Sequence, residues 1–317
     1  MSVKSDVLSL LEASRGAYVS GQSLAERLGV SRAAVWKAVV ALKEEGYQIA
    51  SAPNRGYSLA GDKLSAEGIA ACLEGWRHPI QVLETVDSTN TLAKREVALG
   101  RAQDGAVILA EEQTAGRGRL GRAFYSPRGN GIYLSIILKR PIPVEHASRL
   151  TISAAVAVCQ AIESQTAKRP SIKWVNDVFL GERKVCGILT EAVSDFESGM
   201  VESAVVGIGL NVRSHAFPQP LADIATSLYL EGSTRNALAA AVISRFFALL
   251  EVPWASVLSQ YRDRSMVLGR QVSFSRQGQE VHGLATGINN AGNLEVTLAD
   301  GSSATLIAGD VSIRPLP

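Results

Sequence analysis

The chain has 317 residues, a formal net charge of +2, and a composition that is 46% hydrophobic and 20% charged. This length predicts two or three globular domains, and the near-neutral charge excludes a polycation, so any nucleic-acid binding must come from a local patch. Three cysteines, at positions 72, 159 and 186, are too few and too scattered for a disulfide framework or a zinc site.

The N-terminal segment lacks the long apolar run and small-residue cleavage site of a signal peptide. Apolar runs such as Ala154–Cys159 are far too short to cross a bilayer. We therefore expect a soluble cytoplasmic protein that makes no membrane contact.

The first 62 residues predict three helices followed by a β-hairpin. Gly29 separates the second helix from the third, which Ser31 can cap. A helix–turn–helix followed by a hairpin is the winged form of a reader of the DNA major groove. The alternative is a three-helix interaction module with a solvated basic face. If the segment binds DNA, the contacts are expected from three side chains of the third helix and one near the hairpin tip, namely Arg32, Trp36, Lys37 and Arg55.

The remaining chain predicts two further domains, at residues 63–268 and 269–317. The first has long amphipathic helices and several strands that follow one another without a helix, which favours a mixed sheet over a doubly wound parallel one. Within it, Ser171–Leu180 is expected to form a strand. The last domain has short strands joined by turn residues, typical of a small β-barrel. The fold class is therefore α+β, with a winged helix-turn-helix at residues 1–62, a mixed-sheet α/β domain and a small barrel.

The segment "QTAGRGRLGRAF", residues 113–124, contains the spacing Gly116-x-Gly118-x-x-Gly121 of the dinucleotide fingerprint. A dinucleotide site needs a helix directly after these glycines, because the helix N-terminus receives the pyrophosphate. Here Pro127 and two more glycines follow, and then another β run. The segment is therefore expected to be a loop between two strands, and a Rossmann oxidoreductase is excluded.

Three arginines, Arg117, Arg119 and Arg122, lie within the same loop. Each guanidinium offers paired donors that match a carboxylate or a phosphate, and the glycines let the backbone approach a ligand closely. Like charges this close repel one another unless an anion lies between them. We expect a mobile lid that becomes ordered around a phosphoryl or acyl-phosphate ligand; the alternative is a solvated basic turn.

Further polar residues lie near the ends of predicted strands. Trp174, Asn176 and Asp177 are expected to line a ligand site, and Asp177 is the only obvious partner for Mg²⁺. Lys184 precedes a buried strand, where a lysine is costly unless it meets an anion. That anion is either a ligand or, alternatively, the carboxylate of Glu182 or Asp177.

Ser88, Thr89 and Asn90 precede a predicted helix, where they can form an N-cap or hydrogen-bond a small neutral ligand. Asn211, at the end of "GIGLN", could lie at the mouth of the same site. Cys186 is expected to be a small core residue, and the four histidines lie far apart without a motif, so nucleophilic catalysis by the protein is not supported. A site with these donors suits a reaction in which the substrates supply the nucleophiles and the protein stabilises charge at phosphorus.

The motifs "DSTN", "EEQTAGRGRLGR", "YLS", "KWVNDV", "RKVCGIL" and "GIGLNV" occur in an order and spacing similar to those of biotin–protein ligases. The N-terminal segment resembles the DNA-binding domain of the bifunctional form, which is also the biotin operon repressor. This resemblance, over nearly the whole chain, implies that biotin and ATP, with Mg²⁺, give biotinoyl-AMP and pyrophosphate. A lysine of a biotin carboxyl carrier protein then accepts the biotin. The resemblance also implies a homodimer that, with biotinoyl-AMP bound, represses biotin synthesis genes at operator DNA.

Carried over by position, the resemblance implies roles for individual residues. Ser88, Thr89 and Asn90 would meet the biotin head group, with Gln113 beside them. The lid would close over the adenylate through Arg117, Gly118 and Arg119, with support from Arg122, and Lys184 would hold the carboxyl and phosphate oxygens. Arg117, Arg119 and Lys184 are thus the implied catalytic residues. The implied ligand-binding set also includes Gly116, Trp174, Asn176, Asp177, Gly187 and Asn211, with Asp177 as the metal ligand.

Two positions depart from the family pattern. Val175 stands where the family commonly has proline, and residues 213–230 contain no tryptophan that could stack on adenine. Two other functions remain open: a ligand-sensing transcription factor with weak or no ligase activity, and a lipoate-type ligase, which normally lacks a DNA-binding segment. The intact arginine loop and Lys184 favour catalysis.

Overall fold

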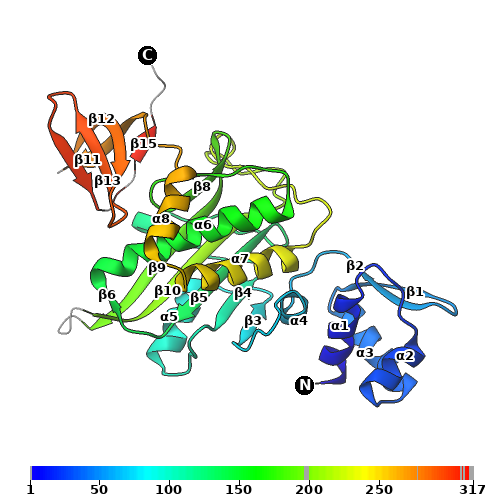
Figure 1. Cartoon of the computed structure of the whole chain (residues 1–317). Helices are drawn as coiled ribbons and strands as arrows, with labels where there is room; N and C mark the ends of the chain where they lie inside the picture. The colour runs from blue at the N-terminus through cyan, green and yellow to red at the C-terminus, as the bar shows by residue number, and fades with distance from the viewer. Residues whose placement is uncertain (1, 196–199, 277, 308, 310, 314–317) are drawn as a thin grey trace. The chain divides into compact units, whose positions relative to one another are not determined.

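The computed structural model describes residues 2–195, 200–276, 278–307, 309 and 311–313 (Figure 1). The chain divides into two compact units. The first holds Met1–Arg77 and Ser233–Ala241, and the second holds His78–Gly232 and Val242–Pro317. Helix α7 (Arg235–Leu250) therefore begins in the first unit and ends in the second. The limits predicted for the domains, at residues 62 and 268, stay a prediction.

The first unit contains the predicted winged helix-turn-helix. Its elements are α1 (Val3–Ala13), α2 (Gly21–Leu28), α3 (Arg32–Glu44), the antiparallel strands β1 (Gln48–Ala52) and β2 (Gly56–Ala60), and α4 (Ala66–Ala70). The hydroxyls of Ser2, Ser20 and Ser31 each accept a backbone N–H three residues ahead and so cap the first three helices. Gly29 ends α2 in the left-handed conformation, with φ 63°. The apolar faces of α1 and α3, together with Leu24, Ile49 and Leu59, form the core.

A buried polar cluster joins the start of α7 to the segment that follows the wing. The side chains of Arg235 and Asp62, only 4% and 5% exposed, form an ion pair at 3.2 Å. The Arg235 guanidinium also donates to the Asp62 carbonyl at 2.6 Å. Asn236 accepts from the Ser65 backbone N–H and donates to the Lys63 carbonyl. Satisfied polar groups of this kind hold two segments that are far apart in the sequence.

We expect Asp62→Ala to lower the free energy of unfolding of this unit by about 3–5 kcal/mol, because it removes the carboxylate that a buried guanidinium pairs with. Urea denaturation followed by circular dichroism measures the change. The matched control is Glu45→Ala in the same unit, since Glu45 pairs with Lys4 at the surface, where both side chains are more than 40% exposed. Loss of that pair should cost at most about 1 kcal/mol. Equal effects of the two substitutions would contradict the stabilising role of the cluster.

The second unit is built around a mixed sheet with the strand order β3-β4-β5-β10-β9-β8-β7, to which β6 adds by pairing with β10. Only the β3–β4 pair is parallel among the described strands, so the predicted mixed sheet is confirmed. The strands are β3 (Ile80–Leu83), β4 (Val107–Ala110), β5 (Gly131–Leu138), β6 (Ile142–Pro143), β7 (Ser171–Lys173), β8 (Asp177–Leu180), β9 (Arg183–Asp195) and β10 (Met200–Asn211).

Helices cover both faces of this sheet. Successive residues of a strand point to opposite faces, so Thr190 and Glu191 of β9 face opposite sides. The Thr190 hydroxyl contacts Thr151 of α6 (Ala147–Gln165), whereas the Glu191 carboxylate contacts Asn90 of α5 (Thr89–Ala98). Therefore α5 and α6 lie on opposite faces, and Figure 1 shows α6 crossing the sheet with α8 (Trp254–Asp263) beside it. No helix in the described ranges is long and apolar enough to cross a membrane.

The prediction of a single strand over Ser171–Leu180 is wrong. The structure breaks this segment into β7 and β8, which pair with each other in an antiparallel hairpin closed at Lys173 and Asp177. The intervening residues are fixed by contacts outside the hairpin: the Trp174 indole donates to the Gly292 carbonyl at 3.0 Å, and the Tyr261 hydroxyl donates to the Val175 carbonyl at 3.1 Å. These tertiary contacts override a local β pattern.

The C-terminal part of the second unit is a five-stranded antiparallel sheet in the order β14-β13-β12-β11-β15. Its turn at 289–293 is held by side chains of α8, since Trp254 and Arg262 donate to the carbonyls of Asn290 and Ile288. The predicted α+β class is confirmed, with an antiparallel sheet in the last part of the chain; its closure into a small barrel stays a prediction. The strands are β11 (Gln271–Arg276), β12 (Gln279–Ile288), β13 (Leu294–Leu298), β14 (Ser303–Leu306) and β15 (Val311–Ile313).

Candidate functional site

The floor of the site is a row of glycines in the middle of the central sheet. Gly209 pairs with Gly187 across β10 and β9, and Gly207 lies two residues along the same strand, so all three face α5. A Cβ on Gly207 would lie 2.3 Å from the side-chain oxygen (Oδ1) of Asn90, and one on Gly209 would lie 2.5 Å from the Phe124 ring. The missing side chains therefore make the room that the site occupies.

The polar wall of the site comes from the start of α5. Ser88 caps the helix by accepting the Thr91 N–H, which confirms the N-cap interpretation of this residue. The backbone N–H of Thr89 donates to the Gln113 side-chain oxygen at 2.9 Å. Asn90 donates to the Leu189 carbonyl at 3.1 Å and accepts from Ser135 at 2.6 Å. The buried amides and hydroxyls are thus held in fixed orientations along a narrow cavity of about 50 Å³.

The glycine–arginine loop connects β4 to β5, as expected, and its regular structure is a 3₁₀ turn, Arg119–Gly121, rather than an α-helix. It closes on itself: the Gly118 N–H donates to the Arg122 carbonyl at 2.7 Å, and the Phe124 N–H donates to the Gly116 carbonyl at 2.8 Å. The exclusion of a dinucleotide fold is consistent with this geometry. The lid's mobility stays a prediction.

Two of the three arginines point toward the sheet. Arg119 donates to the Asn176 side-chain oxygen at 2.8 Å and to the Gly309 carbonyl at 3.2 Å. Arg117 lies 3.3 Å from the Glu191 carboxylate and is about half exposed. Arg122 lines a second, wider cavity. The structure thus gathers the predicted cations around the glycine floor.

The second cavity has a volume of about 380 Å³ and adjoins the first. Its walls are partly aromatic, and Tyr125 meets Phe217 edge to face with ring centroids 6.3 Å apart. Cations and amides line the side next to the glycine floor. A cavity with apolar walls and a few convergent cations suits a planar base that carries phosphates. The residues that line both cavities are Gly118, Arg119, Phe124, Asn176 and Lys184.

Lys184 and Asp177 form an ion pair where the two cavities meet. Their Nζ–Oδ1 distance is 2.7 Å, and the side chains are 34% and 21% exposed. The alternative considered for Lys184, an ion pair with Asp177, is therefore present. Asp177 also accepts from the Asn176 amide at 3.0 Å. No group of three or more potential metal-binding side chains occurs within the described residues, and the carboxylates that line the wider cavity are Asp177 and Glu182.

The other predicted site residues fall in different places. Asn211 lines the wider cavity. Gly116 holds the base of the loop, where a Cβ would lie 2.4 Å from the Phe124 carbonyl oxygen. Trp174 lies outside both cavities: it is 2% exposed, and its indole is directed to the C-terminal sheet.

The sequence analysis did not identify Glu191, whose carboxylate is contacted by three hydrogen-bond donors of the site. Its carboxylate accepts from Asn90 at 2.9 Å and from Lys94 at 2.6 Å, and it lies 3.3 Å from Arg117. Burial acts to raise the pKa of Glu191, but the hydrogen bonds from Lys94 and Asn90 and the nearby positive charges outweigh it and hold the pKa below its usual range. The carboxylate is thus ionised at neutral pH. A charged residue in the midst of the apolar strand "GILTEAV" was the available signal.

The aromatic residues of the wider cavity were missed as well. Phe124 and Tyr125 end the arginine loop, and Phe217 lies within residues 213–230, the segment that has no tryptophan. Their shared signal was an aromatic ring next to a glycine- or proline-rich loop.

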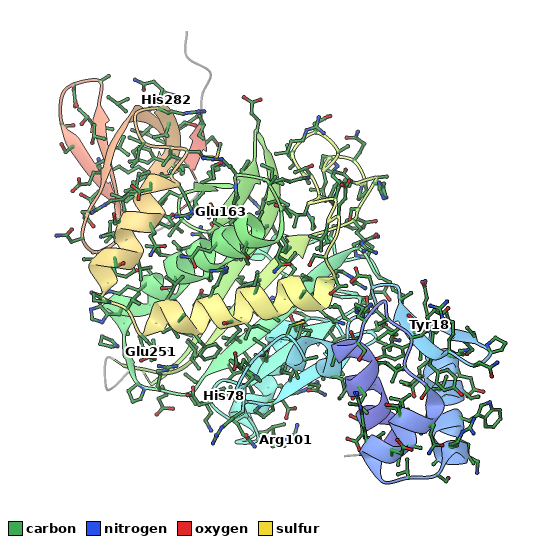
Figure 2. The ribbon with its side chains drawn as sticks, turned by 45° about the vertical axis from the view of Figure 1, so that its right-hand side comes forward. Tyr18, His78, Arg101, Glu163, Glu251 and His282 are labelled. Atoms are coloured by element: carbon green, nitrogen blue, oxygen red, sulfur yellow. The ribbon has the colours of Figure 1, made fainter. Side chains whose placement is uncertain are left out.

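The remaining nucleophile candidates are unsuited to catalysis. Burial raises the pKa of the Cys159 thiol to about 12 and raises that of Cys186 further still, so neither forms a thiolate at neutral pH. Cys186 is fully buried, as expected of a core residue. His78, before β3, and His282, in β12, belong to separate elements and join neither cavity (Figure 2).

Comparisons with known proteins agree with this geometry. Family models match at residues 82–211 (the biotin/lipoate A/B protein ligase family), 3–58 (an HTH domain) and 267–314 (the biotin protein ligase C terminal domain). The chain is 30% identical over 308 residues, 94% of each chain, to the bifunctional ligase/repressor BirA of Escherichia coli K12. The chain belongs to the family of BirA-type ligase/repressor proteins. The resemblance inferred from the motifs is thereby confirmed.

Two further members of this family show the extent of the likeness. The BirA protein of Bacillus subtilis 168 is 38% identical over 232 residues, which cover 71% of this chain and 70% of that protein. The structure of a biotin protein ligase from Aquifex aeolicus in complex with biotin and ATP matches with a TM-score of 0.63 and 28% identity, over 74% of this chain and 98% of that one. The BirA-type fold thus extends across the ligase part of the chain.

The glycine floor can be tested without any ligand. Gly209→Ala would force the Phe124 ring to move, and overpacking of this kind costs about 1–3 kcal/mol of folding free energy. Urea denaturation should show that loss. Gly21→Ala is the control, since its added carbon would meet the Tyr57 ring at an ordinary 3.5 Å and should not destabilise the protein. An unchanged stability of Gly209→Ala would show that the floor tolerates side chains.

Proposed function

We propose that this protein activates biotin with ATP to biotinoyl-AMP and then transfers the biotin to a lysine of a biotin carboxyl carrier protein. The observation that carries this proposal is the pair of adjoining cavities with Arg119 and Lys184 at their junction. The narrow one, walled by Ser88, Thr89 and Asn90, matches the polar biotin head group in its donors and acceptors. The wider one suits the adenosine.

The proposed chemistry places the new bond at the junction. A biotin carboxylate oxygen attacks the α-phosphorus of ATP, and the pyrophosphate leaves with the electron pair of the broken P–O bond. Lys184 and Arg119 stabilise the negative charge that gathers on the phosphoryl oxygens. In the second step the carrier lysine attacks the acyl carbon, AMP leaves, and the amine proton passes to solvent. Since the substrates supply both nucleophiles, the protein needs none.

Magnesium and the adenine ring have residues that fit them. Mg²⁺ is commonly bound through one or two carboxylates together with substrate phosphates, so the carboxylate of Asp177 fits this ion. Bound there, the ion would neutralise charge on the phosphates. Tyr125 and Phe217 are the aromatic groups that we assign to the adenine, in place of a tryptophan.

The first unit supports a second activity, the binding of operator DNA. Arg32 and Lys37 are exposed on α3, and Trp36 between them is 58% exposed, which is unusual for an indole that serves only the core. Arg55 of the wing stacks over the ring of Tyr18, labelled in Figure 2, with 4.1 Å between guanidinium carbon and ring centroid. We infer that these residues bind the operator of biotin synthesis genes, and that biotinoyl-AMP acts as corepressor by promoting a homodimer.

Incubation with ATP, Mg²⁺, a carrier domain and one of three acids, namely biotin, lipoate or octanoate, tests the ligase. The carrier should gain only the biotinyl mass. Lys184→Gln should lower the rate of biotinoyl-AMP formation by about 10²–10³-fold, because one donor to the developing charge is lost. Arg169→Gln, at an exposed residue outside both cavities, is the control. A carrier that gains lipoyl or octanoyl mass would favour the lipoate-type ligase, and no gain would favour the sensor.

Gel shifts with the promoter DNA of biotin synthesis genes test the repressor. The affinity should rise when biotin and ATP are both present, and Arg32→Ala should weaken binding and make it less dependent on salt, since a phosphate contact is lost. If the affinity for DNA is the same with and without biotin and ATP, the corepressor role is contradicted, whereas the ligase proposal is unaffected.

A further inference from the structure

Glu191 lies where the polar wall of the narrow cavity meets the arginine loop. One carboxylate oxygen, Oε1, is shared by two cations, with Lys94 Nζ at 2.6 Å and Arg117 Nη1 at 3.3 Å. The other oxygen, Oε2, accepts from the Asn90 amide at 2.9 Å. The carboxylate belongs to the rigid strand β9, whereas Arg117 belongs to the loop. A single anion thus ties the loop to the sheet.

The two cations differ in how firmly they are held. Lys94 is the closer and is 31% exposed, whereas Arg117 is farther away and 46% exposed. The longer and more exposed contact is the weaker one. Glu191 itself is only 16% exposed, so a carboxylate left without any cation would be costly. In the described part of the chain, Lys94 and Arg117 are the cations within ion-pair distance of Glu191.

We propose that Glu191 is a positioning residue that latches the arginine loop: it holds Arg117 while the site is empty and yields it to a phosphate of the incoming nucleotide. The step is an exchange of ion pairs with no bond made or broken. A guanidinium that leaves a carboxylate for a phosphate keeps a paired, charge-assisted contact. This inference rests on the proposed function, which supplies the nucleotide.

Lys94 sets the strength of this latch. Because its ammonium stays on Oε1, Glu191 remains compensated after Arg117 departs, and the release carries no penalty for a buried unpaired charge. Without Lys94, the whole charge of Glu191 would fall on Arg117, and the loop would be held more tightly. The two residues therefore have opposite effects on the same arginine, which is the signature that separates a latch from a merely structural cluster.

The contact with Asn90 can be kept while the latch is removed. In Glu191→Gln the side-chain oxygen can still accept from the Asn90 amide, but the negative charge that holds Arg117 is gone. The biotin pocket should therefore remain intact, and the KM for biotin should stay within about twofold of the wild-type value. A purely structural role of Glu191 would raise the KM for biotin.

The experiment measures amide hydrogen exchange of residues 115–124 in the ligand-free protein, where the Gly118 and Phe124 N–H groups report loop closure. Glu191→Gln should speed exchange by about two- to fivefold, the range for one partly exposed ion pair. Lys94→Gln should slow exchange by a similar factor. In the double variant, the effect of Lys94→Gln should disappear. Glu96→Gln, on the same helix but paired with Arg101 at the surface, is the control.

The KM for ATP should follow the same pattern, falling in Glu191→Gln and rising in Lys94→Gln. Changes of the same sign in the two single variants, or an effect of Lys94→Gln that persists in the double variant, would overturn the latch. Hydrogen exchange requires no catalysis, and pyrophosphate serves as the phosphate probe. With pyrophosphate bound, the difference in amide exchange of residues 115–124 between the wild type and Glu191→Gln should disappear, because Arg117 has then left Glu191. If biotin is not transferred but exchange behaves as expected, the proposed function fails and the latch stands.

Discussion

The site depends on the absence of side chains at the centre of a crowded sheet. Positions 187, 207 and 209 lie in neighbouring rows of β9 and β10 and face α5, and each is glycine. Elsewhere the same face is filled, since Val205 and Ile137 pack with α5 in a small core. The cavity is therefore a gap in an otherwise continuous layer of side chains between the sheet and α5. Side chains of α5 and of the arginine loop form its walls. Rigid strands beneath it keep the gap open.

Charge is the second constraint, because the site gathers cations before any anionic ligand has arrived. Each of two cations is given a carboxylate on a strand of the sheet: Lys184 has Asp177, and Arg117 has Glu191. These pairs keep the empty site close to neutral and hold the cations within reach of the junction. A phosphate must then compete with a carboxylate for each cation, so an existing ion pair is exchanged when the nucleotide binds.

Local patterns were sufficient to predict some parts of this arrangement and not others. The arginine loop was separable from a dinucleotide site because Pro127 and the β run follow it directly in the sequence. Glu191 was missed because its partners are distant in the sequence: Asn90, on an α-helix, lies 101 residues before it, and Arg117, on the arginine loop, lies about seventy residues before it. Strand register decides which residues share a face, and no local pattern contains that register. The β7–β8 hairpin was predicted as one strand because the tertiary contacts that fix its turn are likewise absent from the local pattern.

The turn in that hairpin shows how tertiary contacts replace a local constraint. Val175 stands where the family commonly has proline, whose ring restricts the backbone by itself. Here two hydrogen bonds hold the turn from opposite partners: Trp174 donates to the C-terminal sheet, and Tyr261 of α8 donates to the Val175 carbonyl. The next residue, Asn176, accepts from Arg119. The position of the arginine loop therefore depends on the C-terminal sheet and on α8. Both act through the turn at residues 174–176, whose own sequence does not fix its conformation.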